Sequence, residues 1–254
     1  MIPYKSQVRA AFSRAADRYD AAAVLQRDVC SHLLAAVTSH SCPSHLLDAG
    51  CGTGYGVELL RTQWPETTVT AVDFVPEMLK HARCHEPHCV VADIEALPFA
   101  AASFDAWWSS LAIQWCNVDA VLREAHRVLS PGGWLAASTL GPGTFRELRE
   151  TFAAVDSHAH TIGFSDIEKL AAAAAGAGFS DIQLNRLTLT LHYPDLRSML
   201  GSVKDIGANT VGSGRRDGLM GKNLWTRLQA VYERRRCEQG LPATYDVILL
   251  TTRR

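Results

Sequence analysis

The stretch HLLDAGCGTGYG, residues 45–56, constrains the fold of this chain more than any other segment. Its first five residues form a short apolar run around Asp48 and predict a buried strand. Three glycines then alternate with other residues, at Gly50, Gly52 and Gly54. Because glycine has no side chain, this alternation lets a ligand approach the backbone closely. The stretch therefore predicts a strand, a glycine turn and the start of a helix, arranged around a bound ligand.

The glycine spacing excludes two common kinds of phosphate-binding loop. A dinucleotide-binding loop, G-x-G-x-x-G counted from Gly50, needs glycine at position 55, where the chain has Tyr55. A phosphate-cradling loop needs Lys followed by Ser or Thr, and the stretch has no such pair. The loop therefore favours an uncharged or cationic nucleoside. Nineteen residues after Gly54, TVTAVDF places Asp73 at the end of a second predicted strand, where a carboxylate can accept both hydroxyl protons of a ribose.

Strand and helix patterns alternate along the chain after the glycine turn. Such alternation is typical of a parallel sheet wrapped by helices, and we expect an α/β fold with a doubly wound, mostly parallel seven-stranded sheet. The expected strands are residues 45–49, 69–72, 89–92, 104–109, 134–139, 182–191 and 244–252. The expected helices cover residues 5–38 (two helices), 120–129, 144–155, 167–175, 195–206 and 224–235. The triplet Pro131-Gly132-Gly133 predicts a tight turn that separates a helix from the fifth strand.

The order of these elements predicts one main domain with four parts. They are N-terminal helices at residues 1–43, a ligand-binding core at 44–192, a helical lid at 193–243 and the last strand at 244–254. The lid is expected because two helical patterns, joined by a glycine-rich segment, interrupt the sheet before its last strand. We expect it to pack near the N-terminal helices, over the open edge of the ligand site.

The number and spacing of the cysteines indicate a protein whose thiols are reduced. The chain has 254 residues and seven cysteines, an odd number without a C-x-x-C pair, so neither a disulfide framework nor a zinc ribbon is predicted. One segment, HARCHEPHC, gathers His81, Cys84, His85, His88 and Cys89. It falls where a surface helix is expected to run into the third strand. We interpret these side chains as ordinary surface residues rather than as a structural metal site.

Charge and hydropathy limit the partners of the chain. The net charge is −1, but residues 197–254 carry 11 Lys and Arg against 5 Asp and Glu. This excess is either a basic face for an acidic partner or an ordinary solvated surface, and it is too small to predict general nucleic-acid binding. The chain has no run of about 18 uncharged apolar residues, and its N-terminus has no apolar secretory core. We expect a cytoplasmic protein without membrane partners.

Polar residues at the ends of three predicted strands converge on one crevice, because open α/β sheets bind ligands at the carboxyl ends of their strands. Asp48 suits the amino-acid end of a nucleoside cofactor, Asp73 its ribose, and Asp93 its adenine, although each aspartate alone is also compatible with a helix cap. In this order they resemble the class I S-adenosylmethionine-dependent methyltransferases. The resemblance implies S-adenosylmethionine as cofactor, S-adenosylhomocysteine as its product and no metal. The implied cofactor site consists of Asp48, Gly50, Cys51, Gly52, Asp73, Phe74, Met78, Asp93, Ile94 and Leu111.

Along its whole length the chain is similar to the malonyl-acyl-carrier-protein O-methyltransferases of biotin biosynthesis. The similarity lies in FSRAADRYDAAAVLQRDV, LAIQWC, STLGPGTFREL, LHYPDLRSMLGSVKDIGANTVGSGR and LPATYDV. The glycine turn points only to the superfamily, whereas STLGPGTFREL and the lid segments are more specific. The chain departs from the family at residues 160–164, HTIGF, where the family tends to have His-Val-Asn before an aromatic residue.

The resemblance implies methyl transfer to the free carboxylate of a malonyl thioester, carried by acyl carrier protein or coenzyme A, as an entry step to pimeloyl groups. A carboxylic acid with a pKa of about 4 is ionised at neutral pH, so we expect no general base. The candidate cations for this carboxylate are Lys204 and Arg215, and the candidate hydrogen-bond donors are Tyr19, Gln114 and His160. Surface pairing and core packing are the alternative roles for each. Basic residues near the C-terminus are candidates for contact with the acidic carrier protein: Arg216, Lys222, Arg234, Arg235 and Arg236.

Two other functions remain compatible with the sequence. A methyltransferase of a quinone precursor or of a free small carboxylic acid would have the same glycine turn, Asp73 and Asp93. A non-catalytic cofactor-binding protein would also retain this site, although the site has no disabling substitution. One class is disfavoured, because SSLAIQWCNV lacks the Asn-Pro-Pro-aromatic motif common among amino-methylating nucleic-acid enzymes. In that segment Gln114 and Trp115 are expected at the rim of the crevice, with core packing as the alternative for Trp115.

Overall fold

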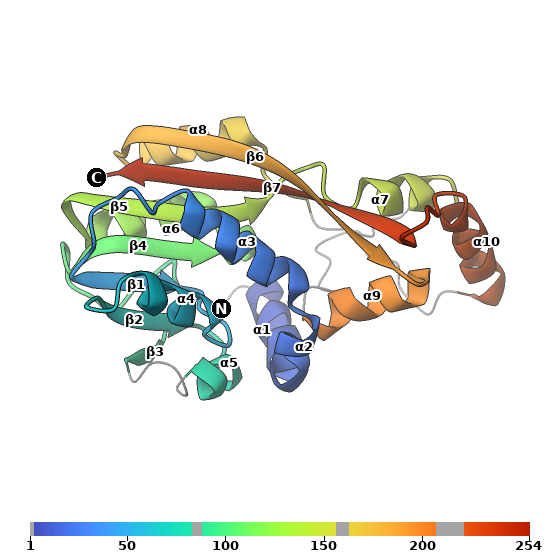
Figure 1. Ribbon diagram of the computed structural model, residues 1–254, viewed down its shortest axis with the longest axis horizontal. Helices are drawn as coiled ribbons and strands as arrows, with labels where there is room; N and C mark the ends of the chain where they lie inside the picture. The colour runs from blue at the N-terminus through green and yellow to red at the C-terminus, as the bar shows by residue number, and fades with distance from the viewer. Residues whose placement is uncertain (1–2, 83–87, 156–162, 207–220) are drawn as a thin grey trace.

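A twisted seven-stranded sheet forms the centre of the molecule. The computed structural model describes residues 3–82, 88–155, 163–206 and 221–254. The strand order is β3-β2-β1-β4-β5-β7-β6 (Figure 1). Neighbouring strands are parallel except at β7, which is antiparallel to β5 and β6, and the predicted fold class is therefore confirmed. The strands are β1 (His45–Ala49), β2 (Thr68–Asp73), β3 (Cys89–Val91), β4 (Phe104–Ser110), β5 (Leu129–Leu140), β6 (Ser180–Tyr193) and β7 (Leu241–Arg253).

Helices cover both faces of this sheet. Helices α3, α4 and α5 contribute to the core on one face, and α6 and α8 contribute to the core on the other. No helix among the described ranges is long and apolar enough to cross a membrane. The helices are α1 (Pro3–Ala15), α2 (Tyr19–Ala22), α3 (Val24–Ala35), α4 (Tyr55–Gln63), α5 (Pro76–Ala82), α6 (Val118–Val128), α7 (Arg146–Ala153), α8 (Ile167–Gly176), α9 (Leu196–Asp205) and α10 (Lys222–Glu233), with short 3-10 helices η1 (Ala16–Arg18) and η2 (Ile113–Trp115).

The core forms on both faces because successive residues of a strand point to opposite sides of the sheet. In β1, Leu46 packs in the core under α3 and α4, whereas Leu47 packs in the core under α6. In β4, Trp108 packs in the same core as Leu46, and Trp107 packs in the same core as Leu47. All four side chains are fully buried. Such continuous apolar runs are typical of parallel strands that are covered on both faces.

The turn expected at Pro131-Gly132-Gly133 is part of β5, so the predicted boundary of the fifth strand is wrong. β5 begins at Leu129, which pairs with Phe104, and its next partnered residue on β4 is Trp134, opposite Ala106. The triplet is thus accommodated as a bulge. Gly133 is required there because a Cβ atom would lie 2.8 Å from the Asp105 carbonyl oxygen.

The N-terminal region also differs from the two expected helices, because it breaks into α1, η1, α2 and α3. α1 and α2 lie beside the carboxyl ends of the parallel strands (Figure 1). This places them over the edge of the sheet where ligands bind in open α/β folds.

The helical insertion predicted before the last strand consists of α9 and α10, which gather with α7 at the end of the long β6–β7 pair (Figure 1). α9 approaches the N-terminal helices as expected, with Arg18 and Asp205 separated by 4.0 Å. α10 packs instead against α7, where Arg235 donates to Glu150 at 2.8 Å. The expected position next to the N-terminal helices is therefore wrong for α10.

A buried carboxylate joins the loop after β5 to the last strand. Asp246 of β7 accepts a hydrogen bond from the Gly143 amide at 2.7 Å and pairs with Arg186 of β6 through both carboxylate oxygens at 2.5 Å. Arg186 holds the pKa of Asp246 below its usual value. Cβ atoms at Gly141 and Gly143 would lie 2.6 and 2.8 Å from the Asp246 Oδ2 atom. The Gly-Pro-Gly sequence of the STLGPGTFREL segment therefore fits the loop against β7.

We expect Asp246→Ala to lower the free energy of unfolding by about 2–4 kcal/mol, because it leaves a buried amide unpaired and removes the partner of Arg186. Urea unfolding at neutral pH measures this change. The matched control is Lys169→Ala, which removes an exposed pair with Asp166 at 3.9 Å and should change stability by less than about 0.5 kcal/mol. An effect of Asp246→Ala no larger than the control would contradict this account of the loop.

Candidate functional site

Two adjoining clefts lie at the carboxyl ends of the central strands. The first cleft, of about 660 Å³, is lined by residues from α1, the glycine turn and the loops after β2, β3 and β4: Lys5, Phe12, Tyr19, Gly50, Gly52, Asp73, Phe74, Val75, Met78, Ala92, Asp93, Ile94, Ser110, Leu111, Ala112, Trp115 and Cys116. The second cleft, of about 480 Å³, is lined by Tyr19, Asp20, Ala23, Gln26, Arg27, Cys30, Asp48, Gly50, Cys51, Gly52, Thr53, Tyr55, Gly56, Trp108 and Ser110. The two clefts are continuous, because both are lined by Tyr19, Gly50, Gly52 and Ser110.

The glycine turn shapes the boundary between the clefts. Gly50 has a φ of +81°, and a Cβ atom there would lie 2.4 Å from the Cβ of Ala112. Its amide donates to the Val72 carbonyl at 2.7 Å, which joins the end of β1 to β2. Gly54, with a φ of +91°, is the residue from which α4 begins. Only glycine can occupy position 50 without backbone strain or a collision with Ala112. The backbone there therefore remains open to both clefts.

Asp73 lies at the end of β2 in the first cleft. Its carboxylate accepts hydrogen bonds from the Gly52 amide at 3.0 Å and the Val75 amide at 2.8 Å. Burial raises the pKa of Asp73 to about 6, against the opposing effect of these backbone hydrogen bonds. Each carboxylate oxygen retains a further acceptor site. The position is therefore fitted to a pair of vicinal hydroxyl groups.

Asp48 lies at the end of β1 in the second cleft and is 2% exposed. Its Oδ2 atom is buried and has no hydrogen-bond partner among the described residues. Burial and the neighbouring charge of Asp73 raise the pKa of Asp48 to about 8. A buried acceptor without a donor is costly, and a cationic donor would both satisfy it and favour its ionised form. The residue therefore fits an ammonium group.

The wall of the first cleft beyond Asp73 is mostly apolar. Phe74, Met78, Ile94 and Leu111 line it, and these side chains suit the faces of a flat aromatic base. Asp93 is the polar residue at the same place, and its carboxylate accepts from the Glu95 amide at 3.0 Å. All ten residues predicted for cofactor binding thus line one or both clefts.

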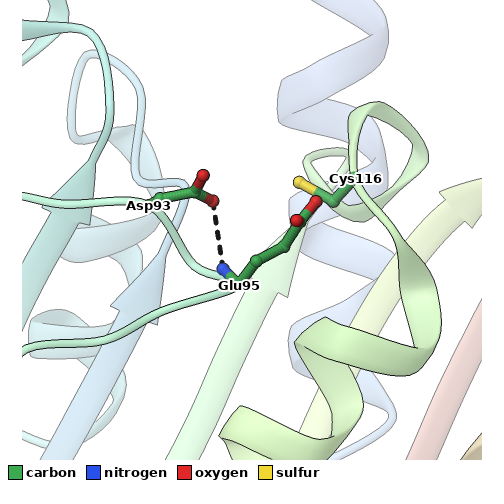
Figure 2. Close-up of side chains that lie close together, drawn as sticks. All are labelled: Asp93, Glu95 and Cys116. Carbon is green, nitrogen blue, oxygen red and sulfur yellow. Dashed lines mark hydrogen bonds between the residues drawn. The ribbon is translucent and has the colours of Figure 1, made fainter. Parts of the chain in front are cut away.

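Asp93, Glu95 and Cys116 come together in the geometry of a possible metal site (Figure 2). The ammonium of Lys5 lies 2.6 Å from Asp93 and 2.7 Å from Glu95. Burial raises the pKa of the Cys116 thiol to about 12, so the sulfur is protonated at neutral pH. The two carboxylates are therefore explained by their ion pairs with Lys5, which join α1 to the loop after β3.

The five residues predicted to contact the substrate differ in where they lie relative to the two clefts. Tyr19 lines both clefts, and burial raises the pKa of its hydroxyl above the usual value. The Gln114 amide donates to the Leu111 carbonyl at 2.7 Å, and Gln114 is absent from the described walls, while its neighbour Trp115 lines the first cleft. The expected position of Gln114 at the rim therefore stays a prediction. Lys204 is exposed on α9 and also lies off both walls. His160 and Arg215 lie outside the described residues.

The sequence analysis missed several residues of the two walls, notably Lys5, Phe12, Gln26 and Arg27. Lys5, Phe12 and Tyr19 are seven residues apart, which places them near one side of the N-terminal helices. Phe12 packs edge-on against Trp115, with ring centroids 5.5 Å apart. This spacing was a usable signal, although it also matches ordinary core packing. Gln26 and Arg27 carried no comparable pattern.

A methyltransferase family model and several curated methyltransferases match this chain. The family model "Methyltransferase domain" matches residues 47–137. The malonyl-[acyl-carrier protein] O-methyltransferase of Dechloromonas aromatica is 46% identical over 99% of this chain and 95% of its own length. The protein of that name from Serratia marcescens is 41% identical over 96% of this chain and 93% of its own length. The bifunctional biotin biosynthesis protein BioHC of Teredinibacter turnerae is 38% identical over 98% of this chain and 47% of its own length.

Solved structures show the same fold at low sequence identity. A methyltransferase from Thermotoga maritima, described as S-adenosylmethionine-dependent, has a TM-score of 0.60 at 19% identity and covers 96% of this chain and 99% of its own. The phosphoethanolamine N-methyltransferase 2 of Haemonchus contortus, solved with S-adenosylmethionine, has a TM-score of 0.59 at 16% identity and covers 95% of this chain and 57% of its own.

The raised pKa of Asp48 predicts how stability changes with pH. Because the folded-state pKa of about 8 exceeds the ordinary aspartate value of 3.8, the folded state binds the proton more tightly. Stability from this group is therefore lost as pH rises through about 4 to 8. Asp48→Asn should remove that loss and raise the Tm of the ligand-free protein at pH 8.5 by at least about 2–4 °C, the equivalent of 1 kcal/mol at this size.

Thermal unfolding at pH 5.5 and 8.5 measures the effect as the difference in pH slope between the variant and the unsubstituted protein. The matched control, Asp119→Asn on the exposed start of α6, should keep the original slope. Equal slopes for all three proteins would show that the Asp48 carboxylate does not take up a proton on folding.

Proposed function

The chain belongs to the malonyl-[acyl-carrier protein] O-methyltransferase family, and from this membership we propose that it transfers a methyl group from S-adenosylmethionine to the free carboxylate of a malonyl thioester on acyl carrier protein. The observation that carries the proposal is similarity along the whole chain, which includes the N-terminal helices and the helical insertion as well as the glycine turn. The methyl ester would mask a charge that is costly to bury during later chain elongation.

The two clefts fit the proposed cofactor. When bound, S-adenosylmethionine supplies a methyl group on a positively charged sulfur. In this proposal Asp73 accepts hydrogen bonds from the ribose hydroxyls, and Phe74, Met78 and Ile94, which line the same cleft, contact the adenine. The unpaired Oδ2 atom of Asp48 suits the cofactor ammonium. Cys51 and Leu111 complete the walls on either side of the glycine turn.

Tyr19 and Cys116 are proton donors rather than bases at neutral pH. Burial raises the pKa of the Tyr19 hydroxyl above its usual value and that of the Cys116 thiol to about 12. This suits a malonyl carboxylate, which is already ionised and acts as its own nucleophile. We propose that Tyr19 donates to this carboxylate and that His160 and Gln114 help to orient it. Gln114 would first have to exchange its bond to Leu111.

Rate acceleration then comes from alignment and from exclusion of water. The N-terminal helices cover the clefts, and two polar contacts hold them there. Lys5 of α1 pairs with Asp93 beyond β3, and the Thr53 hydroxyl of the glycine turn donates to Asp20 of α2 at 2.5 Å. These contacts fix the wall that carries Tyr19 relative to the cofactor site.

The proposed partner is the acidic carrier protein, with coenzyme A as an alternative carrier of the malonyl group. On the helical insertion, Arg235 pairs with Glu150 and Arg236 with Glu233. Lys222 and Arg234 are exposed, and they are the better candidates for contact with an acidic partner. Arg216 lies outside the described residues. A cytoplasmic location, a metal-free reaction and the absence of nucleic-acid and membrane partners belong to the same proposal.

Incubation of the purified protein with labelled S-adenosylmethionine tests the acceptor. We expect the methyl ester on malonyl-acyl carrier protein, and weaker or equal methylation of malonyl-coenzyme A, because the carrier protein adds its own contacts. Free malonate and a quinone precursor serve as the competing acceptors. Methylation of the free acid or the quinone precursor alone would reject the proposal, as would tight cofactor binding without turnover on either thioester.

Lys204→Ala tests the proposed cation for the malonyl carboxylate, together with Arg215. We expect the KM for the malonyl thioester to rise by about 10-fold, since a charge-assisted contact is lost, and the dissociation constant of S-adenosylhomocysteine to stay the same. Lys169→Ala, an exposed lysine on α8, is the control. If Lys204→Ala weakens cofactor binding instead, Lys204 does not act on the acceptor.

A further inference from the structure

One residue in the wall of the first cleft has a strained backbone. Leu111 follows β4 and has a φ of +50°, in the left-handed region that residues other than glycine rarely adopt. Such a conformation persists only where the surrounding structure favours it. The contacts around Leu111 therefore decide whether this part of the wall keeps its shape.

Ser138 of β5 makes the contacts that favour this conformation. The Leu111 amide donates to the Ser138 hydroxyl at 3.0 Å and to the Ser138 carbonyl at 3.1 Å. Ser138 is fully buried, and the described walls of the two clefts do not include it. It is also the first residue of the STLGPGTFREL segment. Its hydroxyl therefore reaches the first cleft through Leu111 rather than by direct contact with a ligand.

Ser110 of β4 provides a second partner for the Ser138 hydroxyl. The two serines are paired in register across the parallel strands, and their hydroxyl oxygens are 3.1 Å apart. A hydroxyl has one donor and two acceptor sites, so the Ser138 oxygen can accept from the Leu111 amide while its proton is shared with Ser110. Because Ser110 lines both clefts, this hydrogen-bonded group lies beneath the place where they join.

The turn at Leu111 sets the rest of the wall. Ala112 packs so closely on the glycine turn that a Cβ atom on Gly50 would lie 2.4 Å from the Ala112 Cβ. The Leu111 carbonyl accepts from the Gln114 amide at 2.7 Å, and Trp115, at the end of η2, lines the first cleft. A change in the φ of Leu111 moves these groups, because they follow it directly along the chain.

We propose that Ser138 is a positioning residue for the cofactor: its buried hydroxyl keeps Leu111 in the left-handed conformation and so holds the wall at residues 111–115 ready for binding. This rests on the proposed function in taking the ligand of the clefts to be S-adenosylmethionine. One neutral hydrogen bond and left-handed strain are similar in size. Loss of the hydroxyl therefore lowers the fraction of molecules with a competent wall, and the apparent affinity falls with that fraction.

Calorimetry with S-adenosylhomocysteine tests this role without a methyl acceptor. Ser138→Ala should raise the dissociation constant about 3- to 10-fold, which corresponds to one lost hydrogen bond. In a Leu111→Gly background the same substitution should raise it by less than about 2-fold, because glycine adopts a positive φ without support. Equal effects in the two backgrounds would show that Ser138 only packs within the sheet, and would overturn the proposal.

Kinetics with malonyl-acyl carrier protein give a second readout. Ser138→Ala should raise the KM for S-adenosylmethionine by a similar factor and keep kcat within about 2-fold, because saturating cofactor restores the competent wall. A lower kcat with an unchanged KM would instead indicate lost folded enzyme and contradict the proposal. The control, Thr252→Val on β7, removes another buried hydroxyl, which donates to the Ser180 carbonyl, and should change neither constant.

A second variant tests the conformation itself and does not depend on the folding of Ser138→Ala. Leu111→Ile keeps the volume of the side chain but branches it at Cβ, which disfavours a positive φ further. With Ser138 intact, it should weaken S-adenosylhomocysteine by about 3-fold or more, and undiminished affinity would overturn the proposal. Failure of the unsubstituted protein to bind S-adenosylhomocysteine would overturn the proposed function, and the role of Ser138 with it.

Discussion

The burial of two carboxylates at adjacent strand ends is the constraint on which the site depends. Asp48 and Asp73 are 2% and 7% exposed, burial raises the pKa of both, and the charge of Asp73 raises the pKa of Asp48 further. Asp73 is stabilised by two backbone amides of the surrounding loops, whereas Asp48 keeps an unpaired oxygen. The fold thus tolerates an energetic cost at Asp48 that a cationic ligand would remove. Such local cost is common where a protein is preorganised for binding.

The loops around these carboxylates follow from the same constraint. Gly50 cannot be replaced by a larger residue because Ala112 occupies the space of a side chain, and Gly56 is held against Asp48 itself. Because Gly52 donates its amide to Asp73, the turn after β1 is tied to the end of β2. One small segment therefore positions the groups of two strands, and its sequence is correspondingly restricted.

The sequence was most informative where structure is local. The short apolar runs of β1 and β4 predicted buried strands. The strand-end positions of Asp48, Asp73 and Asp93 were also predictable, because a parallel sheet brings such ends together. Arg27 was not predictable, because the packing of α3 against distant loops decides which of its side chains reach the clefts. Lys5 had only its seven-residue spacing from Phe12 as a signal, and that spacing also matches core packing. The role of Gln114 stays a prediction: its amide bonds to Leu111 within the same loop, a local contact that its position in the motif did not reveal.

The family-specific segments act largely through position rather than through chemistry of their own. The Gly-Pro-Gly sequence after β5 has close contacts with Asp246, and that carboxylate fixes β7 to Arg186 of β6. The helical insertion begins at the end of β6 and returns into β7, so this contact sets where α9 and α10 start and finish. Gly143 thus supports this part of the fold without lining either cleft. The base of the insertion is held by residues of β6, β7 and the loop after β5, all of them outside the glycine turn.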